Sequence, residues 1–442
     1  MVKNSHVWHP NTQMSEWGKF DKITSAKGMY LIDSNGRRYI DGVASMWCNV
    51  WGHSKIELVS AIKSQAAKLQ HSSMFNLTNE PVELLAKNLI DQSPNMKYVF
   101  FSDNGSTSME IAAKMAIQYW SNVGESKTKI VSLKNGYHGD TFGSMSLGYV
   151  PDFFSPYKTK LFDVTRVPSP DTYRTAGYDV EGNLQMCLEK TEQTISKNSD
   201  SIAALVMESG AQMAAGARIY PSKFQHEISK ICTRHNILLV LDEVATGFGR
   251  LGHMAEYTHQ QSRPDIVSYG KMMTGGYLTM GATLSSKKIY ESFLGKFTEH
   301  KHLFHGHTFT GNPLAAAVAC KNIQLYKKEH LLEKVSRMSK ILKSYTDEFY
   351  KIDAVGDVRS SGLLMGIELV SDKSKKTPIC AKNTSINKIV FEEGKKHGIY
   401  LRTLGNVVML VPPLAIPKEV LDDLVMKTRE TIQAVVQKIS TA

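Results

Sequence analysis

The chain of 442 residues is 42% hydrophobic and 21% charged, with a formal net charge of +11. These proportions are ordinary for a folded globular protein and exclude a disordered or fibrous chain, and no apolar run approaches the roughly 20 residues that cross a bilayer. The basic residues are dispersed rather than gathered into a motif, so we expect neither nucleic acid nor a membrane as a partner. The N-terminus lacks the apolar core of a secretory signal, and the five scattered cysteines form no CxxC pair. Both features favour a cytoplasmic protein.

The predicted elements begin with a β-hairpin, because residues 28–41 alternate in hydrophobicity around a turn at 34–36. From about residue 55, helical and strand patterns alternate. The strands are apolar on both faces, as parallel strands covered by helices must be. Helices are predicted at 57–69 and 106–120, and strands at 98–102, 129–133, 202–207 and 237–241. This alternation is typical of an α/β fold with a mostly parallel sheet.

The pattern changes near residue 330, where the long alternation of helices and buried strands ends. The later elements are a charged amphipathic helix at 331–350, short strands at 363–369 and 407–411, and a helix after Pro417. These patterns predict a large domain and a smaller, discontinuous α+β domain with which the N-terminal segment packs. The three segments are 1–60 at the N-terminus, 61–330 for the large domain and 331–442 for the C-terminal part of the small domain.

A turn of small polar residues joins the predicted strand 98–102 to the helix that follows it. Helix N-termini present unpaired N–H groups and a partial positive charge. Gly105 would let the backbone approach an anion closely, and Ser106 would add a hydroxyl donor. A phosphate cup at these two residues is one interpretation. An ordinary capped helix is the other, because serine and threonine are preferred caps in any case.

Two carboxylates, Asp242 and Glu243, follow the strand predicted at 237–241. Carboxylates are rarely buried without a positive partner. The protonated pyridine nitrogen of a cofactor would be such a partner for Asp242. A metal ion and a salt bridge with Arg250 are the alternatives.

Lys271 lies 29 residues after Asp242, where a short strand in the segment 265–271 delivers it into a turn. A lysine at the end of a buried strand can be desolvated, which lowers the pKa of its amine and makes the amine nucleophilic. Lysines that form Schiff bases are activated in this way. A strand-end aspartate together with a strand-end lysine matches the arrangement of pyridoxal 5′-phosphate (PLP) enzymes, in which the carboxylate partners the pyridinium.

Two further loops carry aromatic or imidazole side chains. Tyr137 and His138 lie between glycines after a strand, where the aromatic ring could stack on a flat cofactor. His305 and His307 precede a helix of small residues. They could be metal ligands, but no third ligand follows at a suitable spacing, so we expect no metal site.

Taken in this order, these motifs resemble the class III aminotransferases of PLP fold type I. The resemblance runs from about Trp8 to the C-terminal helix. The segments that carry it are 8–10, 41–47, 135–141, 242–250, 270–276 and 401–405. It implies a transferase of fold type I, with PLP as cofactor and two active sites at a homodimer interface.

The resemblance also implies a role for each candidate site residue. Lys271 would hold the cofactor and shuttle the proton, and Asp242 would keep the pyridine nitrogen protonated. Tyr137 would lie against the ring and take part in catalysis. The other cofactor contacts would be Gly105, Ser106 and Val244, together with His307 and Thr308 of the partner subunit. The substrate contacts would be Met46, Trp47, Tyr137, Gly306 and Arg402, the last pairing with a far carboxylate of the substrate.

Within the class, the resemblance is greatest to the branch that converts 8-amino-7-oxononanoate to 7,8-diaminononanoate in biotin synthesis. Met46 stands where members using S-adenosylmethionine have tryptophan, and Asn11 where they have tyrosine. The amino donor is therefore left open between S-adenosylmethionine and lysine. Another class III aminotransferase, acting on ornithine or an ω-amino acid, is the alternative activity. A regulator that binds PLP without catalysis is the alternative from another class.

Overall fold

The computed structural model describes residues 6–18, 20–382 and 384–440. A seven-stranded sheet forms the centre of the chain, with the strand order β4-β12-β11-β10-β7-β5-β6. Its strands are β4 (Tyr98–Ser102), β12 (Gly281–Ser285), β11 (Ile266–Tyr269), β10 (Leu238–Asp242), β7 (Ile202–Glu208), β5 (Lys129–Leu133) and β6 (Val164–Val167). The five strands from β11 to β6 run parallel, and β12 is antiparallel to both of its neighbours. The sheet is therefore mostly parallel, as predicted.

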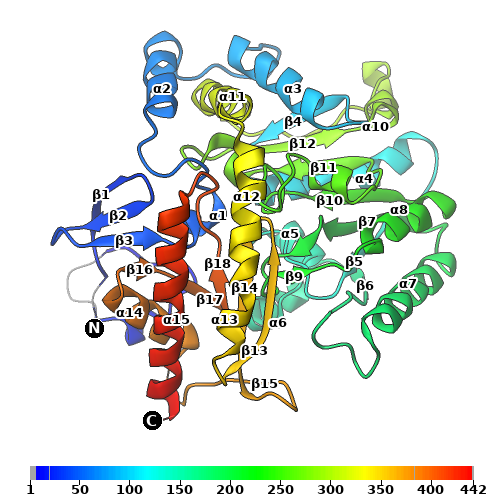
Figure 1. The fold of residues 1–442 in the computed structure, drawn as a ribbon. Coiled ribbons are helices and arrows are strands. Elements are labelled where there is room, and N and C mark those ends of the chain that lie inside the picture. The colour runs from blue at the N-terminus through cyan, green and yellow to red at the C-terminus, as the bar shows by residue number, and fades with distance from the viewer. Residues whose placement is uncertain (1–5, 19, 383, 441–442) are drawn as a thin grey trace.

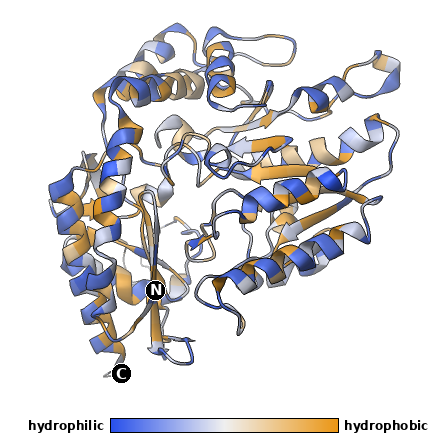
Figure 2. Ribbon diagram, turned by 45° about the vertical axis from the view of Figure 1, so that its right-hand side comes forward, coloured by the Kyte–Doolittle hydropathy of each residue, from blue (hydrophilic) through white to orange (hydrophobic). Residues whose placement is uncertain are grey.

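Helices cover both faces of this sheet (Figure 1). Every residue of β7 and β10 is buried, and the central strands are coloured as hydrophobic in Figure 2. Alternate residues of β10 belong to different core clusters: Val240 packs in the cluster that includes α4, and Leu241 in the cluster that includes α8. The covering helices are α3 (Glu80–Gln92), α4 (Gly105–Asn122), α5 (Phe142–Leu147), α7 (Val180–Ser196), α8 (Phe224–Arg234) and α10 (Lys287–Ser292). The strands are apolar on both faces because helices pack against both faces of the sheet, as predicted.

The N-terminal strands pair with the C-terminal part of the chain. β1 (Ile23–Lys27), β2 (Tyr30–Asp33), β3 (Arg38–Asp41) and β16 (Ile399–Tyr400) form one sheet in that order. The last pairing, between β3 and β16, is parallel. A second sheet contains β13 (Val355–Ser361), β14 (Leu364–Asp372), β18 (Val407–Leu410), β17 (Arg402–Leu404) and β15 (Thr377–Pro378). The helices in this part of the chain are α12 (Leu331–Ser344), α13 (Thr346–Tyr350), α14 (Ile386–Lys396) and α15 (Lys418–Ser440), and α12 and α15 lie side by side (Figure 1).

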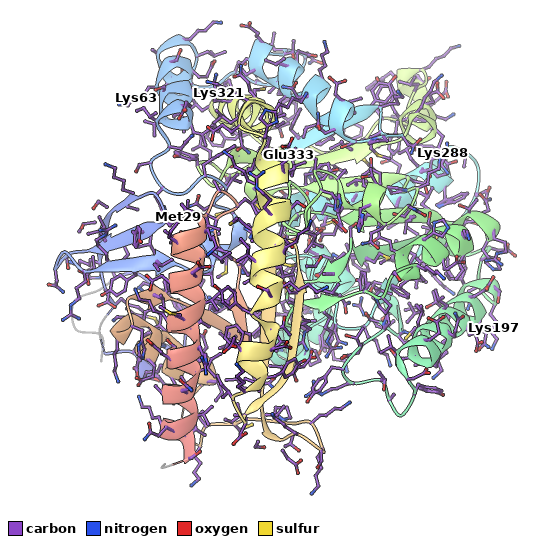
Figure 3. All side chains as sticks on the ribbon, in the orientation of Figure 1. Met29, Lys63, Lys197, Lys288, Lys321 and Glu333 are labelled. Carbon is purple, nitrogen blue, oxygen red and sulfur yellow. The ribbon has the colours of Figure 1, made fainter. Side chains whose placement is uncertain are left out.

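Two remaining long helices, α2 (Ile56–Lys68) and α11 (Pro313–Lys328), pack against each other. Lys63 of α2 and Lys321 of α11 are labelled in Figure 3. Among the described residues, no helix combines the length and apolarity needed to cross a membrane.

One predicted element was wrong in detail, and one strand was missed. The helix predicted at 331–350 is two helices, α12 and α13, separated at Tyr345. The Tyr345 hydroxyl donates a hydrogen bond of 2.8 Å to Asp422 on α15, which fixes this residue where the helix is interrupted. The strand β1 was not predicted, because four of its five residues are exposed and it carries no alternating apolar signal.

Candidate active site

A cavity of about 430 Å³ opens at the carboxyl ends of the parallel strands, within the range of about 300–1,000 Å³ found for small-molecule sites. Such an edge is where α/β sheets usually bind their ligands. The lining residues include Trp47, Asn104, Gly105, Ser106, Tyr137, His138, Thr141, Glu208, Asp242, Val244, Thr246 and Lys271. The fold therefore brings together seven of the predicted site residues, which are Trp47, Gly105, Ser106, Tyr137, Asp242, Val244 and Lys271.

Asp242 ends β10 and is only 5% exposed. Its Oδ2 lies 2.8 Å from His138 Nδ1, and its Oδ1 accepts a hydrogen bond of 2.9 Å from the Val244 N–H. The predicted alternative, a salt bridge with Arg250, is not formed. The buried Arg250 guanidinium instead donates to the carbonyl oxygens of Leu363 and Pro412, at 2.9 and 2.7 Å. The Asp242 side chain thus lines the cavity without an arginine partner in the part of the chain that the structure describes.

Lys271 is the first residue of a 3₁₀ turn that follows β11. Its φ of 33° lies in the left-handed region, an uncommon and strained conformation for a residue with a side chain. Burial lowers the pKa of the Lys271 amine below 10.5, although the charges of Asp242 and Glu208 oppose that shift. A lowered pKa increases the neutral, nucleophilic fraction of the amine.

Glu208 is a cavity residue that the sequence analysis missed. It ends β7 and is 6% exposed, and the pairing of β7 with β10 places it opposite Asp242. Burial, followed by the charge of Asp242, raises the pKa of Glu208 well above 4.5. The signal in the sequence was a carboxylate at the end of a fully apolar strand, and the same signal identified Asp242.

The N-terminus of α4 forms one wall of the cavity. Asn104 caps the helix by accepting the Thr107 N–H at its side chain and the Ser108 N–H at its carbonyl. The N–H groups of Gly105 and Ser106 are therefore the first-turn donors that an anion in the cavity could use. The Ser106 hydroxyl also accepts a hydrogen bond of 3.2 Å from the Thr141 N–H.

Gly105 leaves space that no other residue could leave. A Cβ atom on Gly105 would lie 2.4 Å from Val244 Cγ1. This contact is far inside the normal separation of about 3.5–4.0 Å between carbon atoms. The position therefore requires glycine because of close packing, although its φ is ordinary.

Trp47 reaches the cavity from an unusual turn, α1 (Ala44–Trp47), in which all four residues have positive φ between 46° and 74°. The Asp41 carboxylate holds the turn by accepting the Ser45 N–H and hydroxyl at 2.9 and 2.7 Å. The Trp47 ring centroid lies 5.5 Å from Lys271 Nζ. Met46, from the same turn, lines a neighbouring cavity of about 480 Å³ together with Tyr400.

Five predicted site residues do not line the catalytic cavity of their own chain: Met46, Gly306, His307, Thr308 and Arg402. Gly306 packs against the ring of Phe75. His307 Nδ1 lies 3.1 Å from the Asp103 carboxylate, just before the cap of α4. Arg402 begins β17, and its positive charge opposes the rise in pKa that burial causes at Tyr400. Within one chain, therefore, these residues do not form the site.

The cavity residues fit PLP. A phosphate fits the N-terminus of α4, an aldehyde fits the amine of Lys271, and a protonated ring nitrogen fits the carboxylate of Asp242. The buried His138 Nε2 and Thr246 Oγ1 atoms have no hydrogen-bond partner among the described residues, so the cavity offers further polar contacts. Such buried polar atoms usually find a partner, and a bound ligand would supply it.

The family model described as aminotransferase class III matches residues 15–432. The chain belongs to this family and is a PLP-dependent aminotransferase of fold type I. Two similar relatives are both named adenosylmethionine-8-amino-7-oxononanoate aminotransferase. The protein of Geobacter sulfurreducens is 39% identical over 436 residues, which cover 97% of this chain and 96% of the relative. That of Staphylococcus aureus is 40% identical over 443 residues, which cover 98% and 97%.

Solved structures give the same family. The crystal structure of the enzyme with that name from Methanocaldococcus jannaschii matches with a TM-score of 0.91 and 38% identity, over 97% of each chain. An omega transaminase from Pseudomonas jessenii, in complex with PMP, matches with a TM-score of 0.93 and 29% identity, over 98% of this chain and 97% of that one.

Proposed function

We propose that this aminotransferase converts 8-amino-7-oxononanoate to 7,8-diaminononanoate in biotin synthesis, with S-adenosylmethionine or lysine as amino donor. Similarity over nearly the whole chain to several enzymes named for this substrate supports the choice. The single observation that carries the chemistry is the placement of the Lys271 amine and the Asp242 carboxylate in one cavity. This arrangement also favours an enzyme over a regulator that only binds PLP.

The positions of the cavity residues suggest a role for each of them. The Lys271 amine would hold PLP, and Asp242 would hold the ring nitrogen in its protonated form. Gly105 and Ser106 would bind the phosphate, with Tyr137 and Val244 beside the ring. His138, bonded to Asp242 at 2.8 Å, would orient that carboxylate. When bound, PLP supplies an electron sink for a carbanion on the substrate.

The proton transfer would belong to Lys271. With the cofactor and a donor bound, Nζ would take the proton from the carbon that bears the amino group. A lowered pKa favours this role, because a neutral amine can act as a base near neutral pH. Trp47 would exclude water from the space beside Lys271. The same residues would act in the reverse order on the ketone substrate.

We also propose a homodimer in which His307 and Thr308 reach the cofactor of the partner subunit, while Met46, Gly306 and Arg402 contact substrate. Two features support this arrangement. The His307–Thr308 segment lies outside the cavity of its own chain, and large aromatic side chains near it are exposed. These are Phe75, Phe304 and Phe309, at 62%, 71% and 58% exposure. A cytoplasmic location and the absence of nucleic-acid or membrane partners complete the proposal.

The decisive experiment follows product formation with one donor at a time. Holoenzyme is supplied with 8-amino-7-oxononanoate and S-adenosylmethionine, lysine or ornithine, and 7,8-diaminononanoate is measured by mass spectrometry. The proposal expects product with one of the first two donors, and parallel double-reciprocal lines. It expects no product with the Lys271→Ala variant. Turnover of ornithine or another ω-amino acid with a 2-oxo acid as acceptor, and no reaction of 8-amino-7-oxononanoate, would establish the alternative activity instead.

A further inference from the structure

Three metal-ligating side chains gather outside the catalytic cavity, around the short helix α9 (Glu256–His259). One ligand atom from each of His253, Glu256 and His259 lies within 4.8 Å of the other two. His253 Nδ1 and Glu256 Oε2 are 3.2 Å apart. Two ligands at about 2.0–2.2 Å from a tetrahedral zinc ion lie about 3.3–3.6 Å from each other. The first pair is therefore close to the separation that a shared ion requires.

The burial of Glu256 distinguishes this cluster from polar side chains that meet by chance at the surface. The residue is 1% exposed, and its Oε1 accepts a hydrogen bond of 2.8 Å from the Gln260 amide. Its Oε2 faces His253 rather than a lysine or an arginine. Buried carboxylates are normally paired with a cation or bound to a metal. A metal ion between Glu256 and the imidazoles would supply the missing positive charge.

The backbone under the cluster is firmly held. The buried Glu243 carboxylate accepts the N–H groups of Glu256 and Tyr257, at 2.8 and 2.6 Å. Glu243 itself follows Asp242 at the end of β10. A metal ligand on a supported backbone loses little freedom when it binds, which favours affinity.

The two imidazoles lie at the surface end of the cluster. Their rings stack, with centroids 4.0 Å apart and planes 10° from parallel, and 41% of the His253 side chain is exposed. A lone pair on an imidazole nitrogen lies in the plane of its ring. One ring must therefore turn out of the stack for both nitrogens to meet one ion. The exposed His259 can make this turn, and water can reach the fourth position.

We propose that His253, Glu256 and His259 bind one divalent transition-metal ion of the zinc type, with water as the fourth ligand. Two imidazoles and a carboxylate form a ligand set that zinc favours. The site is separate from the catalytic cavity, whose lining includes none of these three residues. The ion would fasten the loop that follows Arg250 to α9.

The test titrates ZnCl₂ by calorimetry into holoenzyme that has been freed of metals with a chelator and of unbound PLP, which binds metals itself. One site per chain is expected. His253→Ala and His259→Ala should weaken binding by at least about 10- to 100-fold, since losing even the outer partners of metal ligands has effects of that size. Glu256→Gln, which keeps the contact with Gln260 but removes the charge, should also weaken it.

A matched control is the pair His330–Glu333 at the start of α12, where Glu333 is labelled in Figure 3. It has the same spacing in sequence and the same 3.2 Å separation, but both side chains are about 70% exposed. Among the described residues no third ligand joins it. His330→Ala should leave zinc binding unchanged. The absence of saturable binding, or equal affinity in all the variants, would overturn the proposal, with circular dichroism and cofactor absorbance checking that each variant is folded.

Discussion

Gly105→Ala should weaken cofactor binding through a steric clash with one residue, Val244, with little effect on the rest of the fold. The new methyl group would lie 2.4 Å from Val244 Cγ1 and 3.0 Å from Val244 Cγ2. Val244 cannot turn away from it, because both of its methyl groups meet the intruding atom and β-branched side chains have few rotamers. Its backbone N–H donates a hydrogen bond to the Asp242 carboxylate, so a shift of Val244 would also move this carboxylate in the cavity.

The magnitude follows from the cost of overpacking, which is about 1–3 kcal/mol for an added methylene in a packed site. If that cost falls on the bound state, PLP affinity should decrease by about 5- to 150-fold. The double variant Gly105→Ala/Val244→Ala removes both clashing methyl groups and leaves the Val244 Cβ position, at 3.3 Å, as the closest contact. It should therefore recover part of the lost affinity.

The assay is titration of apoprotein with PLP, followed by absorbance, for wild type, each single variant and the double variant. Thermal unfolding of the four apoproteins separates cofactor binding from stability. The reasoning would be refuted if Gly105→Ala bound PLP as tightly as wild type, or if Val244→Ala gave no recovery in the Gly105→Ala background.

Three further predictions concern the groups around the cavity. The raised pKa of Glu208 means that the folded apoprotein keeps this proton above pH 4.5 while the unfolded chain releases it, so this group lowers stability as pH rises above 4.5. Glu208→Gln should flatten that decline in urea unfolding, and an unchanged slope would disprove the assignment. The pKa of Lys271 is lowered, so below pH 10.5 the unfolded chain binds the proton more readily and stability rises with pH in that window. Lys271→Met should abolish this rise in the apoprotein, and the explanation fails if the two unfolding curves stay parallel. Asp41→Ala should cost about 1–3 kcal/mol in unfolding free energy and raise the KM for substrate, because it removes the charged acceptor of the Ser45 N–H and hydroxyl in the turn that carries Trp47. An unchanged unfolding free energy and an unchanged KM would show that the turn does not depend on Asp41.

The catalytic pair could be predicted from sequence because it follows from simple topology. Asp242 ends an apolar strand, Lys271 lies two residues beyond the end of the next strand, and parallel strands that neighbour each other bring their carboxyl ends together. The same rule applied to the strand at 202–207 would have predicted Glu208. The strand pattern therefore contained more information about the cavity than the motifs alone.

Other features depend on contacts that a sequence pattern does not encode. The turn that carries Trp47 is left-handed over four residues without a glycine, and it depends on the Asp41 carboxylate. The predicted helix is interrupted at Tyr345, whose hydroxyl donates a hydrogen bond to Asp422 on the distant α15. Sites that involve a partner subunit, such as the one proposed for His307, cannot be assembled from one chain. The boundaries of the three predicted segments also remain a prediction.

The most direct test of the account is to find which residue carries the cofactor. Holoenzyme would be reduced with borohydride, which fixes a bound carbonyl cofactor to the amine that holds it, and digested for peptide mass spectrometry. The account predicts a phosphopyridoxyl group on Lys271 alone and none in Lys271→Ala. A label on another lysine, or a Lys271→Ala variant that still carries the covalent group, would contradict the assignment of Lys271.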